Sequence, residues 1–345
     1  MSIDVEKLKL VMFLIGMFFL VPAYAAKTDI VILVNGDAVT GEIKALDFGD
    51  LRYSTDSMGT VSIDWEDIVS ITSDQNLEIV ITDGSKYYGR LLAPEHDSTI
   101  RVKTASQEVS LAAGQIVRIT PIETSDKFWQ RVDGSFSFGF QSQKSSEVSS
   151  SNATADISYR TRKYLVGFQL NSTITEQAIE PTTARQSVEI NYQRFRPNRW
   201  FTDWFSRWER NDELGINGRK SLGGALGRFF LQTNRNQFSL TAGLQAATTT
   251  FTSEEETTTQ AEGRIELRYL HRSLIPESSL TFTSKVYPLI EDLSQFRAET
   301  DIIFRREFFK DLFWDVTIGH SYLSDPTEGA SNSDHSITTS IGFKF

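Results

Sequence analysis

The chain has 345 residues, no cysteine, 39% hydrophobic residues and a formal net charge of −10. The absence of cysteine excludes disulfides, zinc–thiolate sites and a lipoprotein anchor, and the length allows two domains. Past residue 26, no apolar run approaches the roughly 20 residues of a membrane helix. A transmembrane β-barrel is not excluded, because its lipid-facing and lumen-facing residues alternate and their hydropathies average out.

Residues 1–25 are predicted to form a cleaved signal peptide. Lys7 and Lys9 supply its charged region, residues 10–21 its apolar region, and Ala23-Tyr24-Ala25 the small-x-small cleavage pattern. The alternative is an uncleaved inner-membrane anchor, but an apolar core of about a dozen residues is short for a membrane span.

The predicted periplasmic domain occupies residues 26–120, and an internal repeat spans residues 29–120 of it. The segment DIVILVNG at 29–36 is echoed by LEIVITDG at 77–84, an offset of 48 residues (77 minus 29), which also relates Ile68 to Ile116. A constant offset over a whole unit indicates duplication of one small β-domain. In each copy Asn-Gly or Asp-Gly supplies the positive φ angles of a tight hairpin, and two more short strands follow. We therefore predict duplicated units that resemble SH3-like or Sm-like small barrels.

The charge of this repeat argues against one function of Sm-like folds. Residues 29–118 contain 15 acidic and 7 basic residues, so the repeat lacks the electrostatic footprint of nucleic-acid binding. Trp65, flanked by Asp64, Glu66 and Asp67, could mark a cation or partner site. We favour a buried Trp65 with carboxylates that are solvated or cap a turn.

After a linker at 121–131, residues 132–345 show long two-residue alternation. Phe136, Phe138 and Phe140 share one face, and at the end of the chain Ile337, Thr339, Ile341, Phe343 and Phe345 share another. Strands of about ten residues with polar opposite faces are typical of an outer-membrane barrel and are longer than a soluble sheet requires. The fold class is therefore all-β: duplicated small units followed by an antiparallel transmembrane barrel.

The number of alternating segments predicts about twelve strands, which begin near residues 132, 152, 163, 185, 199, 214, 237, 261, 278, 295, 311 and 335. Connections after even-numbered strands are short and rich in arginine, and most of the others are longer and carry Ser, Thr and acid, as at 254–256. The connection at 210–213 is the exception. Short periplasmic turns and long external loops are the asymmetry expected of an outer-membrane barrel, with the repeat on the periplasmic side.

The inward-facing positions carry charges of both signs. The candidates to line the lumen are Glu189, Arg207, Arg219, Arg264, Glu266, Arg268, Lys285, Arg297, Glu299 and Asp301. They predict either a polar channel whose paired charges tune solute passage, or an ion-pair network that fills and blocks the barrel. No cofactor, metal site or phosphate loop is expected from the motifs present.

A lipid-modifying hydrolase is the enzymatic alternative, since such enzymes need a base, usually histidine, beside a Ser or Thr nucleophile. His271 and His320 share the parity of the apolar faces and could touch lipid, while His96 and His335 lie elsewhere. Packing at the membrane interface is the role we favour for His271 and His320, and we predict no catalytic residues and no enzymatic activity.

Two stretches resemble the family of bacterial barrels named salt-induced outer-membrane proteins. They are LVNGDAVTGEI at 33–43 with GTVSIDW at 59–65, and WFTDWFSRWERNDELGI at 200–216 with LGGALG at 222–227. The resemblance covers nearly the whole mature chain. It implies an outer-membrane barrel, and it brings no activity, cofactor or catalytic residue with it.

These patterns together predict a small outer-membrane channel with a periplasmic accessory domain. The alternative is a non-conducting envelope protein whose repeat, residues 29–120, binds a periplasmic protein or peptidoglycan. Either protein would contact outer-membrane lipid and lipopolysaccharide. Ile341, Phe343 and the terminal Phe345 resemble the signal that the barrel-assembly machinery recognises in its clients.

Overall fold

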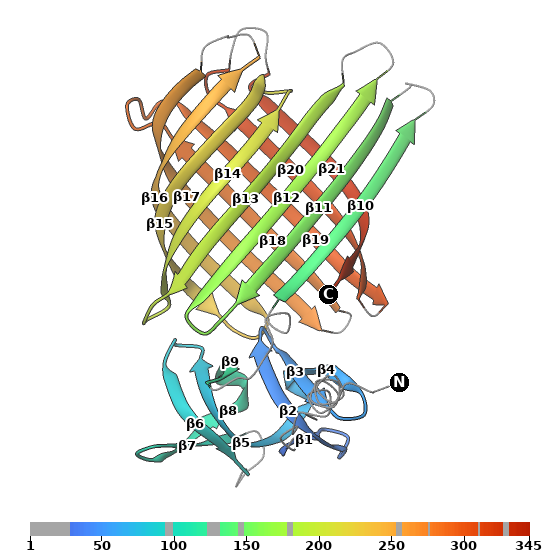
Figure 1. The fold of residues 1–345 in the computed structure, drawn as a ribbon, viewed down its shortest axis with the longest axis vertical. Coiled ribbons are helices and arrows are strands. Elements are labelled where there is room, and N and C mark those ends of the chain that lie inside the picture. Colours follow the sequence, from blue (N-terminus) through green and yellow to red (C-terminus); the bar gives the residue numbers. More distant parts are fainter. Residues whose placement is uncertain are drawn as a thin grey trace, which may run out of the picture.

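The computed structural model describes residues 28–93, 99–122, 132–143, 148–177, 182–252, 257–274, 277–309, 311–326 and 331–345. The predicted signal peptide, most of the predicted linker, His96 and the acidic loop at 254–256 lie outside these residues. Figure 1 shows a small β-region at one end of a tall closed barrel, next to the start of β10.

The small β-region comprises nine strands and two short 3-10 turns. They are β1 (Asp29–Leu33), β2 (Ala38–Asp47), β3 (Asp50–Thr55), β4 (Gly59–Asp64), η1 (Trp65–Asp67), β5 (Ile68–Ile81), β6 (Lys86–Leu92), β7 (Thr99–Thr104), β8 (Glu108–Ala112), η2 (Ala113–Gln115) and β9 (Ile116–Pro121). The strand order is β4-β3-β2-β1-β5-β6-β7-β8, and β9 pairs with both β2 and β5.

The pairing registers reproduce the sequence repeat. Strand β1 pairs with the first half of β5, placing Val31 opposite Ile71, and the second half of β5 pairs with β9, placing Ile79 opposite Ile119. Both members of the first pair move by 48 residues to give the second, and the β-bulge in each pairing falls at the matching position. β5 therefore ends the first unit and begins the second.

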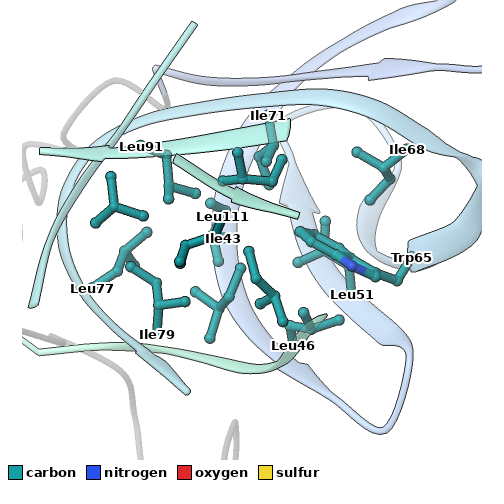
Figure 2. Packing of buried hydrophobic residues seen from close by; sticks show 14 of the residues in the cluster. Ile43, Leu46, Leu51, Trp65, Ile68, Ile71, Leu77, Ile79, Leu91 and Leu111 are labelled. Carbon is teal, nitrogen blue, oxygen red and sulfur yellow. The ribbon is translucent and has the colours of Figure 1, made fainter. Parts of the chain in front are cut away.

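One hydrophobic core serves both units, and Figure 2 shows its side chains. Ile43, Leu77 and Ile79 are fully buried, and Trp65 is 3% exposed. The Trp65 Nε1–H donates a hydrogen bond of 2.8 Å to the carbonyl of Ala113, the position that corresponds to Trp65 in the second unit. The prediction that Trp65 is buried is confirmed, and the ring links the two copies at equivalent turns.

The rest of the chain forms a closed antiparallel barrel in the order β10 to β21. Its strands are β10 (Val132–Gln143), β11 (Val148–Arg160), β12 (Tyr164–Gln177), β13 (Thr183–Phe195), β14 (Trp200–Asn211), β15 (Ile216–Gln232), β16 (Asn236–Phe251), β17 (Thr257–Leu274), β18 (Glu277–Pro288), β19 (Phe296–Phe309), β20 (Leu312–Leu323) and β21 (Ser333–Lys344). The pairing of β10 with β21 closes the barrel, and Gly134 and Phe345 exchange two backbone hydrogen bonds at the seam.

The predicted all-β class and the barrel of twelve strands are confirmed, and each predicted strand start lies within four residues of the observed one. The connections after β11, β13, β15, β17 and β19 span two to four residues, and the others span four to nine. The short connections meet the small β-region (Figure 1). We call this the short-turn end and the opposite one the long-loop end.

The barrel's outer face is apolar. Phe136, Trp204, Leu222, Leu244 and Ile341 are each more than half exposed and lie on five different strands. Exposed side chains of this size on every second residue match a lipid-facing surface. In the part of the chain that the structure describes, no helix is long and apolar enough to cross a membrane.

Because Trp65 fills the core and bonds across the repeat, we expect Trp65→Ala to destabilise the small β-region by about 3–5 kcal/mol. Hydrogen exchange of peptides from β5 in the full-length protein would measure this loss. Met58→Ala is the control, because the Met58 side chain is 61% exposed. Equal protection of β5 in the two variants would contradict the assignment.

Candidate functional site

Charged side chains from six strands meet inside the barrel. Glu189 on β13 contacts Arg264 on β17 at 2.8 Å and Lys285 on β18 at 3.3 Å. Arg207 on β14 contacts Glu299 on β19 at 3.1 Å. Since these strands are not neighbours in the barrel, the pairs can form only through its interior.

These contacts belong to one connected network, which we call the lumenal charge cluster. It consists of Glu189, Arg207, Glu209, Arg219, Glu262, Arg264, Glu266, Lys285, Arg297 and Glu299. Five acidic and five basic groups balance one another, so the cluster adds no formal net charge to the lumen.

The lumenal charge cluster is buried. Arg264 is 2% exposed and Arg297 is 5% exposed, and each guanidinium also lies over a ring, that of Phe205 at 3.8 Å and that of Tyr287 at 4.3 Å. A buried charge is tolerated only where partners replace its lost hydration. The cluster therefore holds its side chains in fixed positions and fills the half of the lumen lined by β13 to β19.

The opposite wall, formed by β10 to β12, presents small polar residues. Gly139, Thr154 and Gly167 have the inward parity of their strands, and Ser137 bonds Thr154 at 2.6 Å. Asp156 and Asn171 share that parity and are exposed to solvent. Arg305 on β19 donates a hydrogen bond of 3.1 Å to Ser135 on this wall, and the exposed residues show that water reaches part of it.

The structure brings together eight of the ten residues predicted to line the lumen: Glu189, Arg207, Arg219, Arg264, Glu266, Lys285, Arg297 and Glu299. Asp301 follows Glu299 by two residues on the inward face of β19, 4.0 Å from Arg185, with 41% of its side chain exposed. Arg268 follows Glu266 on the inward face of β17, outside the cluster. Their part in solute passage stays a prediction.

Sequence reasoning missed two members of the cluster, Glu209 and Glu262. Both stand two residues from a predicted lumenal arginine, so strand parity alone places them on the same face. Two smaller groups were also missed: Arg185 with Asp334 at 3.5 Å, and Arg305 with Asp315 at 3.2 Å.

The histidines considered for catalysis lie apart from the cluster. His271 Nδ1 is 2.8 Å from the Asn236 side-chain oxygen near the short-turn end, and His320 is opposite His335 on β21. In the described part of the chain, no three His, Asp or Glu side chains form a group that could hold a metal ion.

A second candidate site is the junction between the small β-region and the short-turn end. Arg160, at the end of β11, reaches Asp47 at 3.3 Å, and Arg52 reaches Asp133 at 2.7 Å. We call these, together with Glu66–Arg235, Asp50–Arg272 and Glu78–Arg162, the junction ion pairs. In four of the five, an acidic group of the small β-region meets an arginine of a barrel turn or strand end.

Asp47 contacts two arginines, Arg160 of the barrel and Arg118 of the small β-region. Burial by itself would raise its pKa, but the guanidiniums of Arg160 and Arg118 outweigh that effect and hold the pKa of Asp47 below its usual range. A carboxyl group with a lowered folded-state pKa stabilises the docked arrangement above its ordinary pKa. That contribution disappears as the pH falls through the lowered value.

A closed antiparallel barrel with an apolar outer face and a polar, charged interior defines a transmembrane β-barrel of the outer-membrane type. Residues 136–345 match the family described as "Protein of unknown function, DUF481", and the chain belongs to that family. The match does not test the resemblance to the salt-induced outer-membrane proteins.

Two solved structures are similar in fold. One is the NanC porin, at 11% identity and a TM-score of 0.39, covering 62% of this chain and 100% of that one. The other is the β-domain of the Bordetella autotransporter BrkA, at 10% identity and a TM-score of 0.33, covering 62% of this chain and 98% of that one. A search of curated proteins finds no match.

We expect Arg297→Met to destabilise the barrel by about 3–5 kcal/mol, because it leaves Glu209 and Glu299 buried with one cation fewer. Urea unfolding of protein folded into lipid vesicles would measure the loss. The matched control is Arg210→Met, which breaks an ion pair with Asp212 whose arginine is 40% exposed and which is worth about 0–1 kcal/mol. Equal urea midpoints for the two variants would show that the cluster does not stabilise the barrel.

Four of the junction ion pairs are partly exposed on both sides, while Glu78 is buried, and the exposed pairs are expected to weaken in high salt and in acid. Because the chain has no cysteine, a Ser85→Cys/Leu293→Cys variant can carry one spin label on the small β-region and one at the long-loop end of the barrel. The distance between the two labels then reports on docking. At pH 7 we expect a narrow distribution of distances between the two labels. We expect it to broaden at 1 M NaCl, where the Debye length falls to about 3 Å and exposed charges are screened, and also near pH 3. Asp47→Asn should broaden it at pH 7 already. A narrow distribution under every condition would refute electrostatic docking.

Proposed function

We propose that the protein is a small channel of the bacterial outer membrane, with the small β-region in the periplasm. The observation that carries this proposal is the asymmetry of the lumen. The lumenal charge cluster fills the side lined by β13 to β19, while the wall of β10 to β12 carries small side chains and exposed polar groups. Ions would pass along this second wall.

The exposed charges support a preference for cations. The cluster is balanced, so the passage depends on groups outside it. Asp156 is exposed and 41% of the Asp301 side chain is exposed, against the exposed inward-facing cation Arg268. Rings of acidic side chains favour cations in pores of this kind.

The proposed orientation has two supports. Short turns face the periplasm in barrels of this class, and the small β-region docks at the short-turn end (Figure 1). The predicted leader would bring the chain to the periplasm before insertion. The proposal includes no enzymatic step, and the His271 ring contacts the side-chain oxygen of Asn236.

The channel is tested by recording the purified full-length protein in planar bilayers under a salt gradient. We expect small conductance steps with a reversal potential on the cation-selective side, and a shift toward zero for Asp156→Asn. Asp292→Asn is the control, because Asp292 is exposed in the connection between β18 and β19, where its carboxylate accepts hydrogen bonds from Ser294. An absence of steps would overturn the channel proposal.

A second candidate function is partner binding by the small β-region. Ile30, Ile32 and Val34 are 41%, 38% and 63% exposed at alternate positions along β1 and its end. Three exposed apolar side chains on the same face of β1 and its end form a candidate contact surface for an envelope protein. Photocrosslinking from position 34, which is 63% exposed, would capture this protein in intact cells, and Ile32→Glu in the same chain should abolish the product.

A further inference from the structure

A cleft of about 610 Å³ opens at the junction, beside the junction ion pairs. Its walls are the hairpin between β5 and β6, the turn between β11 and β12, and the turn between β13 and β14. Its volume is in the range of small-molecule sites, about 300–1,000 Å³.

The cleft is strongly cationic, although the whole chain has a net charge of −10. The charged residues that line it are Lys86, Arg162, Lys163 and Arg196, with Glu78 as the single acid. Glu78 is already paired with Lys86 at 3.2 Å and lies 3.9 Å from Arg162. Within the described ranges, Lys163 and Arg196 have no carboxylate at ion-pair distance. Two cations therefore remain available to an anion from outside the chain.

The cleft lies at the depth of lipid headgroups. Tyr192, Trp200 and Phe230 are 40%, 39% and 50% exposed on the outer face near the short-turn end. Rings at this position form the girdle that marks the membrane–water interface. Arg196 follows Tyr192 by four residues, and the turn to which it belongs ends at Trp200.

We propose that this cleft binds the phosphate headgroup of an anionic phospholipid from the inner leaflet of the outer membrane. Lys163 and Arg196 would contact the phosphate oxygens, since paired cations with several N–H donors are the usual protein partners of phosphate. Tyr88, which is 47% exposed in the cleft, offers a ring and a hydroxyl to the glycerol part of the headgroup. The lipid would thereby contact both the barrel and the small β-region.

Native mass spectrometry of the full-length protein from nanodiscs of mixed phosphatidylcholine and phosphatidylglycerol tests the proposal. We expect retained phosphatidylglycerol in the wild type. The Lys163→Gln/Arg196→Gln variant should bind it roughly 25-fold more weakly, because each basic residue near an anionic lipid contributes roughly fivefold. The matched control is Arg90→Gln/Lys103→Gln, which removes the same charge from two exposed, directly opposite positions on β6 and β7 of the small β-region.

The outcomes separate lipid from soluble phosphate. Retention of phosphatidylglycerol equal to that of phosphatidylcholine in the wild type, or equal loss in both double variants, would overturn the proposal. If millimolar glycerol 3-phosphate in detergent displaces the lipid from the wild type and binds with the same affinity as the lipid, the cleft is a site for a soluble phosphate. That result would also overturn the proposal. None of these readouts depends on conductance, so the result stands apart from the channel test.

Discussion

The buried pairing of charge across the lumen is the interaction on which the rest of the barrel depends. A closed barrel of twelve strands encloses more space than apolar side chains fill in this chain, and its inner face carries arginines and glutamates that cannot be left unpaired out of water. Arg207 reaches Glu299 from five strands away. Ion pairs of this kind between distant strands determine the shape of the interior. They hold the long charged side chains on the side of β13 to β19, and the small side chains lie on the side of β10 to β12.

Opposite charges are also paired at the short-turn end, but there they are in contact with water. The duplicated region is acidic and the barrel turns are rich in arginine, so the two parts attract one another over a wide surface. Pairs such as Arg160–Asp47 are partly exposed and individually weak. Docking therefore depends on several of them at once, whereas the charges of the lumenal cluster are paired with one another out of contact with water. The contrast predicts a stable barrel with a small β-region whose docking responds to ionic conditions.

Much of the fold could be predicted from the sequence. Each strand of a sheet with one apolar face shows an alternation of apolar and polar residues, and the duplication of the small β-region appears as a constant offset of 48 residues between similar segments. The largest differences in strand starts, four residues for β11 and β17, fall where Ser and Thr runs carry no alternation. Parity also placed Glu189 and Arg264 on the inner face. Their contact could not be predicted, because it depends on the tilt and stagger of strands four apart. The acidic repeat and the basic turns were both recognised, but nothing in a linear pattern joins Asp47 to Arg160.

The central claim is that the lumen has a packed side and a side open to water. Single cysteines introduced into this cysteine-free chain and treated with a charged thiol reagent in vesicles test it directly. The account predicts fast modification of Asp156→Cys and Asn171→Cys, and slow modification of Ser221→Cys, whose position is 8% exposed beside the cluster. Equal rates at all three positions would contradict the division of the lumen on which the proposed channel depends.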